Sequence, residues 1–164
     1  MDLEDGEAKF IAPIKLVKER SCHMSAYSEK QNRLYVMGGF DGYESLNEME
    51  FVDLNEPEPK FEALPDMFSR VKNGFAVFNE EDQCIYMLGG WDEKNTTTSV
   101  FKFNTLTNKM SYDGALPKQF EGHACVYVPE TQTVFIFGGF DDFGVTDRIM
   151  SYDLRSGSGS VIYG

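Results

Sequence analysis

The sequence lacks the long apolar runs and the basic N-terminus that mark membrane and secreted proteins. No apolar stretch approaches the roughly 18 residues that a membrane-spanning helix needs. The first ten residues, MDLEDGEAKF, are acidic, whereas a secretory signal begins with basic residues and continues with an apolar core. We therefore expect a soluble, cytoplasmic protein with no membrane partner.

Positive charge is also scarce. The 164 residues include 15 Lys and Arg against 27 Asp and Glu, so the formal net charge is −12. Such a charge repels the phosphates of nucleic acids, and we expect no nucleic-acid partner. A basic protein or peptide is the natural electrostatic match, while the alternative is that the acids only keep the surface soluble.

Cysteine and histidine are too few to build a disulfide framework or a metal centre. Cys22, Cys84 and Cys125 form an odd set without a CxxC pair and lie in strand-like runs, which predicts reduced core residues. His23 and His123 each open a strand-like run, and we expect them to bond to the backbone rather than to a metal. No GxSxG, HExxH or P-loop motif is present, so the sequence predicts neither a cofactor nor catalysis.

What the chain does have is a repeated ten-residue pattern. The segments RLYVMGGFDG, CIYMLGGWDE and TVFIFGGFDD each join an apolar strand to two glycines, an aromatic residue and an aspartate. The second glycines are 51 and 49 residues apart, and this period with its short strands is typical of radial β-sheet arrays. The glycine pairs are Gly38 and Gly39, Gly89 and Gly90, and Gly138 and Gly139.

Further segments align around each glycine pair. The strand-like runs EMEFVD, SVFKFN and RIMSYD end 14 residues after the second glycine. The runs HMSAY, NGFAVF and HACVYV begin 16, 17 and 16 residues before it, and we assign the extra residue in the middle copy to a longer hairpin turn. A fourth strand follows in KFEALP and KMSYDGALP, with an earlier copy, KFIAPI, at 9–14 and a weaker later one at 161–163.

These features resemble the Kelch repeat, and the resemblance covers Lys9 to Tyr163. It rests on the glycine pairs, the apolar strand before each, the aromatic residue with Asp or Asn that closes the next strand, and the opening histidines. It implies an all-β fold, namely a Kelch-type β-propeller with three four-stranded blades, which is a half or partial propeller. Each glycine pair would end an inner strand where two backbones come too close for a side chain, so the motif need not touch a ligand.

The resemblance also predicts domain bounds, and the chain departs from the family pattern at two places. We expect a flexible acidic N-terminus at 1–8 and a repeat domain at 9–164, with a leading outer strand at 9–14 and repeats at about 20–67, 70–117 and 120–164. Family members usually carry Trp in the fourth strand, where this chain has Phe61, Met110 and Val161. Asn73 stands where the other two copies have His.

Three blades do not close a ring, since propellers typically have about 4–8. Open blade faces lined by apolar side chains promote association. Three solutions are open: a homodimer that forms one six-bladed ring, a longer protein of which this chain is a fragment, or a different propeller that supplies the missing blades. The segment at 9–14 favours the homodimer, because it can complete a blade of the second subunit.

The resemblance places the binding surface in loops at one face of the propeller. These are the loops that enter the first strand of each blade and those that follow each glycine pair. Aromatic side chains among charges suit a protein interface, because rings anchor a partner and charges select it. The predicted protein-binding residues are Arg20, Arg70, Phe120, Tyr43, Glu44, Asp92, Lys94, Asp142 and Phe143.

The sequence thus predicts a non-catalytic Kelch-type module that binds a protein or peptide. One alternative is a small-molecule enzyme resembling Kelch-propeller isomerases or lyases, with Arg20, Arg70 and nearby acids facing one pocket. The other is a scaffold subunit whose only role is to fill a larger assembly.

Overall fold

The protein is an all-β chain of short strands, as the sequence predicts. The computed structural model describes residues 14–141 and 143–164. In that part of the chain the regular elements are strands, apart from one 3-10 turn at Pro129–Thr131. No helix within it is long and apolar enough to cross a membrane.

The first unit is a four-stranded antiparallel sheet in which each strand pairs with the next one in the chain. Its residues form strands because apolar and polar side chains alternate and polar turns separate the runs. In the first strand, for example, Met24, Ala26 and Ser28 are buried while the two residues between them are exposed. The strands are β1 (Met24–Ser28), β2 (Arg33–Met37), β3 (Met49–Asp53) and β4 (Phe61–Leu64).

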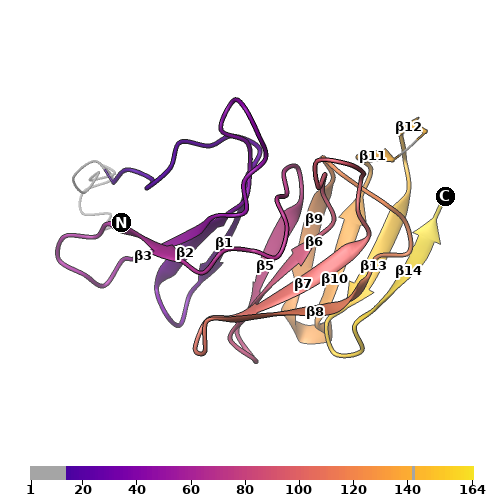
Figure 1. The fold of residues 1–164 in the computed structure, drawn as a ribbon. Coiled ribbons are helices and arrows are strands. Elements are labelled where there is room, and N and C mark those ends of the chain that lie inside the picture. The colour runs from indigo at the N-terminus through magenta and orange to yellow at the C-terminus, as the bar shows by residue number, and fades with distance from the viewer. Residues whose placement is uncertain (1–13, 142) are drawn as a thin grey trace, which may run out of the picture.

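The second and third units repeat this meander inside one eight-stranded sheet. The sheet order β5-β6-β7-β8-β14-β13-β10-β9 consists of two four-stranded antiparallel halves, which meet through a parallel pair between Ser158 and Ala115. Figure 1 shows the three units in a row, with β1–β3 at one end and β13–β14 at the other. The strands are β5 (Phe75–Asn79), β6 (Cys84–Leu88), β7 (Ser99–Asn104), β8 (Lys109–Ala115), β9 (Ala124–Val128), β10 (Thr133–Phe137), β13 (Ile149–Asp153) and β14 (Ser158–Tyr163), with a small ribbon of β11 (Phe140–Asp141) and β12 (Gly144–Val145).

The strand-like runs of the sequence coincide with these elements. The weaker fourth strand expected at 161–163 lies within β14. The leading strand expected at 9–14 falls outside the described residues except for Ile14, which is not in a strand.

The strand register corrects one detail of the repeat alignment. The first hairpins of the three units begin with the pairs Met24 and Met37, Phe75 and Leu88, and Ala124 and Phe137. The residues just before these hairpins are therefore His23, Gly74 and His123. The prediction that Asn73 takes the place of histidine was wrong, and so was the longer turn in the middle copy.

The backbone shows why Asn73 misled the alignment. Cys22, Asn73 and Gly122 are the equivalent residues, and all three have a left-handed conformation with φ of 52°, 57° and 60°. Asn tolerates this conformation better than most residues, so its presence marks a turn and not the strand start. The Asn73 N–H donates to the Cys22 carbonyl at 2.9 Å, and the Gly122 N–H donates to the Asn73 carbonyl at 2.8 Å.

An apolar core fills each of the two spaces between consecutive units. Tyr35 of the first unit stacks on Phe78 of the second, with ring centroids 5.8 Å apart. Full burial of a large apolar side chain contributes about 1.5–3 kcal/mol, so these two layers supply most of the driving force for folding. The first core includes Met24, Tyr35, Met37, Met49, Phe78, Ile85, Met87 and Phe103, and the second includes Tyr86, Leu88, Val100, Phe120, Val134, Ile136, Met150 and Tyr152.

Each of the first two glycine pairs packs against the backbone of the following unit. The Gly39 N–H donates to the Val71 carbonyl at 2.8 Å, and the Gly90 N–H donates to the Phe120 carbonyl at 2.8 Å. A Cβ on Gly38 would lie only 2.4 Å from the Val71 oxygen. The expected close approach of two backbones at the glycine pair is confirmed.

Replacing Gly39 by Ala tests how closely the glycine pair also packs against the entry segment of its own unit, with Gly42→Ala as a matched control. The two glycines have nearly the same φ, 105° and 101°, but a Cβ on Gly39 would lie 2.5 Å from the Ser21 oxygen, whereas a Cβ on Gly42 meets nothing within 4 Å. We expect Gly42→Ala to lose about 1–2 kcal/mol from backbone strain and Gly39→Ala to lose a further ~1–3 kcal/mol from overpacking. Urea unfolding measures both, and equal losses would contradict the packing argument.

Candidate protein-interaction surface

An aspartate shapes each loop that follows a glycine pair. In the first loop, the Asp41 carboxylate accepts hydrogen bonds from the backbone N–H groups of Tyr43 and Glu44 at 2.9 and 3.0 Å. These bonds lower the pKa of Asp41. In the third loop, Asp141 accepts from the Phe143 N–H at 2.8 Å. Such bonds from the backbone to an aspartate two or three residues earlier fix a tight turn, so these carboxylates hold the loop tips in place.

The second loop is built in the same way and is tied to the first. Asp92 accepts from the backbone N–H groups of Lys94 and Asn95 at 3.1 and 2.9 Å. The Glu93 carboxylate accepts from the Ser45 backbone N–H at 2.7 Å, and hydrogen bonds from Ser45 lower the pKa of Glu93. The predicted site residue Asp92 therefore positions its own loop and leaves Lys94 at the tip.

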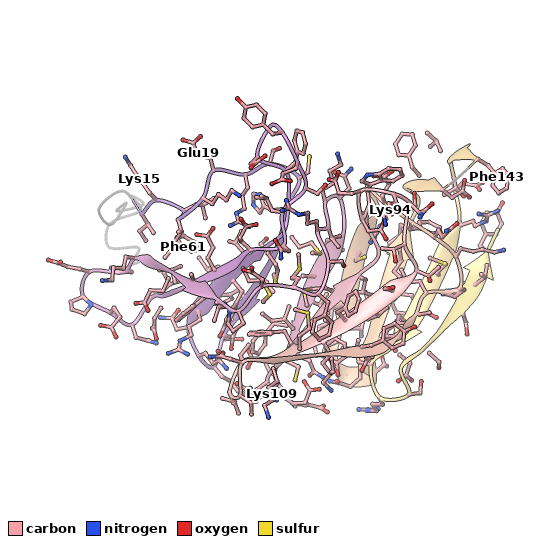
Figure 2. The ribbon with its side chains drawn as sticks, viewed as in Figure 1. Lys15, Glu19, Phe61, Lys94, Lys109 and Phe143 are labelled. Atoms are coloured by element: carbon pink, nitrogen blue, oxygen red, sulfur yellow. The ribbon has the colours of Figure 1, made fainter. Side chains whose placement is uncertain are left out.

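The loop tips carry two of the most exposed aromatic side chains of the described chain. Tyr43, Lys94 and Phe143 each lie four residues after the second glycine of their pair, and Tyr43 and Phe143 are 94% and 97% exposed. Figure 2 shows Lys94 and Phe143 on the upper side of the molecule in this view, with Lys109 on the lower side. The predicted surface thus presents ring, cation and ring at equivalent positions of neighbouring units.

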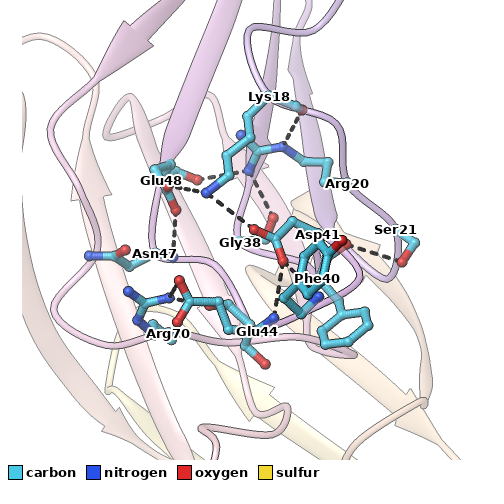
Figure 3. Close-up of polar contacts among 12 residues, drawn as sticks. Lys18, Arg20, Ser21, Gly38, Phe40, Asp41, Glu44, Asn47, Glu48 and Arg70 are labelled. Carbon is cyan, nitrogen blue, oxygen red and sulfur yellow. Dashed lines mark hydrogen bonds and ion pairs between the residues drawn. The ribbon is translucent and has the colours of Figure 1, made fainter.

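Arg70 and Glu44, both predicted site residues, form a surface ion pair beside the first loop (Figure 3). The Arg70 guanidinium lies 2.7 Å from the Glu44 carboxylate and donates to the Ser45 carbonyl at 2.9 Å. The two side chains are 42% and 52% exposed. Exposed pairs contribute only about 0–1 kcal/mol, so both charges are open to exchange with charges of a partner.

Arg20 is not part of the exposed surface, contrary to the prediction. Its side chain is 1% exposed and lies 2.5 Å from the equally buried carboxylate of Glu50. The same guanidinium donates to the carbonyls of Gly38 and Glu48 at 2.8 and 2.9 Å (Figure 3). This hydrogen-bonded ion pair fastens the segment before β1 to β3, and it leaves Arg20 no donor side to offer a partner.

Phe120 is likewise buried, and Asp142 lies outside the described residues. The Phe120 side chain is 0% exposed and belongs to the second apolar core. The corrected register makes Phe120 equivalent to Val71 and Arg20, because each lies two residues before the left-handed residue of its unit. This position packs inward in all three units, so its residue type alone was a poor guide to exposure.

Sequence reasoning missed Glu50 as the partner of Arg20. Glu50 is equivalent to Phe101 and Met150. Each of the three follows the residue that pairs with the end of the preceding strand, at Met37, Leu88 or Phe137. A charged residue in a column that is otherwise apolar was the available signal. A buried carboxylate requires a cation nearby, and Arg20 in the equally apolar column of Val71 was the candidate.

His123 differs from its expected state. It is buried before β9, but neither ring nitrogen has a hydrogen-bond partner among the described residues, so the expected bond to the backbone is absent. The ring lies against Phe75 and Phe120, with centroids 6.4 and 6.2 Å away. Burial in these apolar surroundings lowers the pKa of His123 to about 4.

Comparisons with known proteins show the fold and leave the family open. No family model matches the chain. The chain is 27% identical over 155 residues to the Leucine-zipper-like transcriptional regulator 1 homolog of Drosophila melanogaster, covering 87% of this chain and 15% of that protein. Among solved structures, YjhT superposes with a TM-score of 0.75 at 15% identity, covering 92% of this chain and 53% of the YjhT chain. The chain therefore shares the fold of about half of YjhT and spans a small part of the Drosophila protein.

The buried ion pair predicts a specific pattern of stability changes. Glu50→Met or Arg20→Val alone leaves one charge buried without its partner, so each should destabilise the fold by about 3–5 kcal/mol. The double variant places in the first unit residue types that the other units carry there and should recover most of that loss. Urea unfolding of the four proteins checks this, and a double variant less stable than either single one would contradict it.

His123 predicts an acid-sensitive stability. Its folded pKa of about 4 lies below the ordinary value of 6.5, so the unfolded chain binds the proton more readily. The stability contributed by neutral His123 is complete above pH 6.5 and is lost as the pH falls toward 4. We expect a loss of about 2 kcal/mol between pH 7.5 and 5 in unfolding experiments, and His123→Phe should remove most of it. An unchanged slope in that variant would refute the assignment.

Proposed function

We propose that this chain is a non-catalytic protein-interaction module, formed by three four-stranded blades of a Kelch-type β-propeller. Three repeated four-stranded units, the glycine pairs between them and the similarity to about half of YjhT support this proposal. The blades complete a six-bladed ring by self-association, and loops on one face bind a protein or peptide. The cytoplasm is the proposed location.

The observation that carries the proposal is the pair of exposed aromatic tips. Tyr43 and Phe143 stand almost entirely in solvent, on loops that aspartate side chains hold in shape. Rigid aromatic side chains are the usual anchors of protein interfaces, since they bury a large area at a small cost in side-chain entropy. Rings with this exposure bury little apolar area within the chain, so they contribute little to its stability.

The charge of the surface points to a basic partner. The net charge of −12 attracts cationic segments and repels nucleic acid. Glu44, next to the first tip, forms an exposed ion pair with Arg70. A Lys or Arg of a partner can take the place of Arg70 in this pair. We therefore propose a basic protein segment or peptide that places apolar side chains on the tips.

The arrangement of the arginines favours binding over catalysis. The enzyme alternative requires Arg20 and Arg70 to face one pocket. Arg20 lines one hollow with Lys18, Glu48 and Glu50 and another with Lys15, Leu16 and Glu19, and Arg70 lines neither of them. In addition, the Arg20 side chain is buried against Glu50, so it is poorly placed to receive a substrate.

Selection of peptides from a random displayed library on the immobilised protein tests the proposal. We expect the selected peptides to be rich in Lys and Arg. Tyr43→Ser and Phe143→Ser should each weaken binding about tenfold or more, because loss of an aromatic anchor has such an effect. Leu106→Ser is the control, since Leu106 is 72% exposed but lies in the turn that leads to Lys109, on the lower side in Figure 2.

Two outcomes would count against this proposal. Peptides whose affinity is unchanged by both tip variants would remove the loops from the binding surface. A thermal shift with one compound of a small-molecule library, in the absence of any peptide binding, would favour the enzyme alternative, because a tight ligand raises stability by mass action.

A further inference from the structure

The outward faces at the two ends of the row of units match the two sides of the contact, or joint, that forms between consecutive units. We propose that the outward face of the third unit docks on the outward face of the first unit in a second copy of this chain, reciprocally, so that two copies share two identical joints. The inference rests on the self-association in the proposed function and is independent of the ligand-binding loops.

The outward face of the third unit repeats a face that is buried elsewhere in the chain. Strand register makes Val126 equivalent to Val77, and Phe137 equivalent to Leu88. Val77 and Leu88 are 6% and 0% exposed, because the third unit covers them. Val126 and Phe137 are 55% and 40% exposed. The third unit thus turns outward a face that, one unit earlier, binds a four-stranded sheet of this chain.

The outward face of the first unit repeats part of the complementary half, because Val36 and Val52 on the same face are already buried within the chain, at 7% and 0% exposure. Tyr27 is equivalent to Phe78, and Leu34 to Ile85, by the same register. Phe78 and Ile85 are 7% and 0% exposed in the core between the first two units, whereas Tyr27 and Leu34 are 47% and 37% exposed. Tyr27 and Leu34 pair directly across β1 and β2, so they form one apolar patch.

Equivalence also predicts which rings meet across the joint. Tyr35 stacks on Phe78 between the first and second units. Phe135 is the third unit's equivalent of Tyr35, and Tyr27 is the first unit's equivalent of Phe78. The proposed joint therefore stacks Phe135 of one copy on Tyr27 of the other.

The backbone at the two ends offers matching donors and acceptors. At both internal joints the second glycine of a pair donates to the carbonyl of the segment entering the next unit, at 2.8 Å. Within 14–141 and 143–164, the corresponding Gly139 N–H has no acceptor and the Arg20 carbonyl has no donor. A second copy brings these two groups together.

A second backbone bond repeats in the same way. The left-handed residue of each later unit donates its N–H to the carbonyl of the preceding one, at 2.9 and 2.8 Å. The series leaves the Cys22 N–H and the Gly122 carbonyl without partners in the described part of the chain, and both residues are exposed. The joint would pair them, so it reproduces both internal backbone bonds and the apolar contact.

A second copy is the partner that supplies all of these groups at once. One chain covers 53% of YjhT, so two copies match the extent of that similar structure. Head-to-tail contacts form a closed ring when the rotation between units allows it, and closure makes two joints for a single loss of rigid-body freedom. Each copy carries a charge of −12, so association should strengthen as salt screens the repulsion.

Complementary variants test the joint by native mass spectrometry and by light scattering after size exclusion at micromolar concentration. Wild-type protein should have twice the 18.6 kDa chain mass. Phe137→Glu and Tyr27→Glu each place a carboxylate in both joints of a dimer, and each should raise the dissociation constant by on the order of a hundredfold. A mixture of the two variants should form more dimer than either variant alone, because one of the two joints in a mixed pair then has two wild-type faces. Its dissociation constant should stay above that of the wild type, because the other joint carries both carboxylates.

Leu106→Glu is the control for adding a charge to an exposed apolar position away from both faces, and it should leave the dimer intact. Unfolding curves check that each variant folds, which is expected because positions 137 and 27 are already 40% and 47% exposed. A monomeric wild type at all concentrations would overturn the self-association itself. A dimer that tolerates both variants, or variants that do not rescue each other, would overturn only this joint and leave the ligand-binding loops unaffected.

Discussion

The structure depends on the contact between each of the first two glycine pairs and the backbone that enters the next unit. At this point an N–H of one unit and a carbonyl of the following unit form a 2.8 Å bond, with no room for a Cβ between them. Because the contact fixes the loop after the glycine pair beside the next unit's entry segment, it also brings Glu44 within reach of Arg70 and Glu93 within reach of Ser45. The geometry of the candidate surface follows from a constraint of the fold.

The sequence predicts the strands well because their signals are local. Alternating apolar residues and polar turns are read within five or six residues, and the three copies reinforce one another. The register before the first strand was wrong in the second unit, because the left-handed conformation shared by Cys22, Asn73 and Gly122 leaves no common residue type. Local patterns do not reveal a backbone conformation that Cys, Asn and Gly all adopt.

Exposure of site residues was harder to predict, because it depends on contacts between units. Tyr43 and Phe143 are at loop tips, where nothing else packs, and their exposure follows from loop position alone. Arg20 and Phe120 lie in the segments that enter the first and third units. Arg20 donates to the glycine pair of its own unit, and Phe120 packs in the core between the second and third units. Residue type suggested a binding cation for Arg20, whereas its burial is set by Glu50, 30 residues away in the chain.

The ends of the row show how one sequence balances solubility against association. On the first unit, Arg20 and Glu50 place a satisfied ion pair in columns that are apolar elsewhere, which leaves a smaller apolar patch around Tyr27 and Leu34. The third unit has no such pair and exposes Val126 and Phe137. A half-exposed apolar side chain gains only about 1 kcal/mol on burial, while association costs at least ~4 kcal/mol of rigid-body freedom. One joint with a few such side chains is therefore marginal, and the second joint of a closed pair, formed without a further loss of that freedom, decides in favour of association.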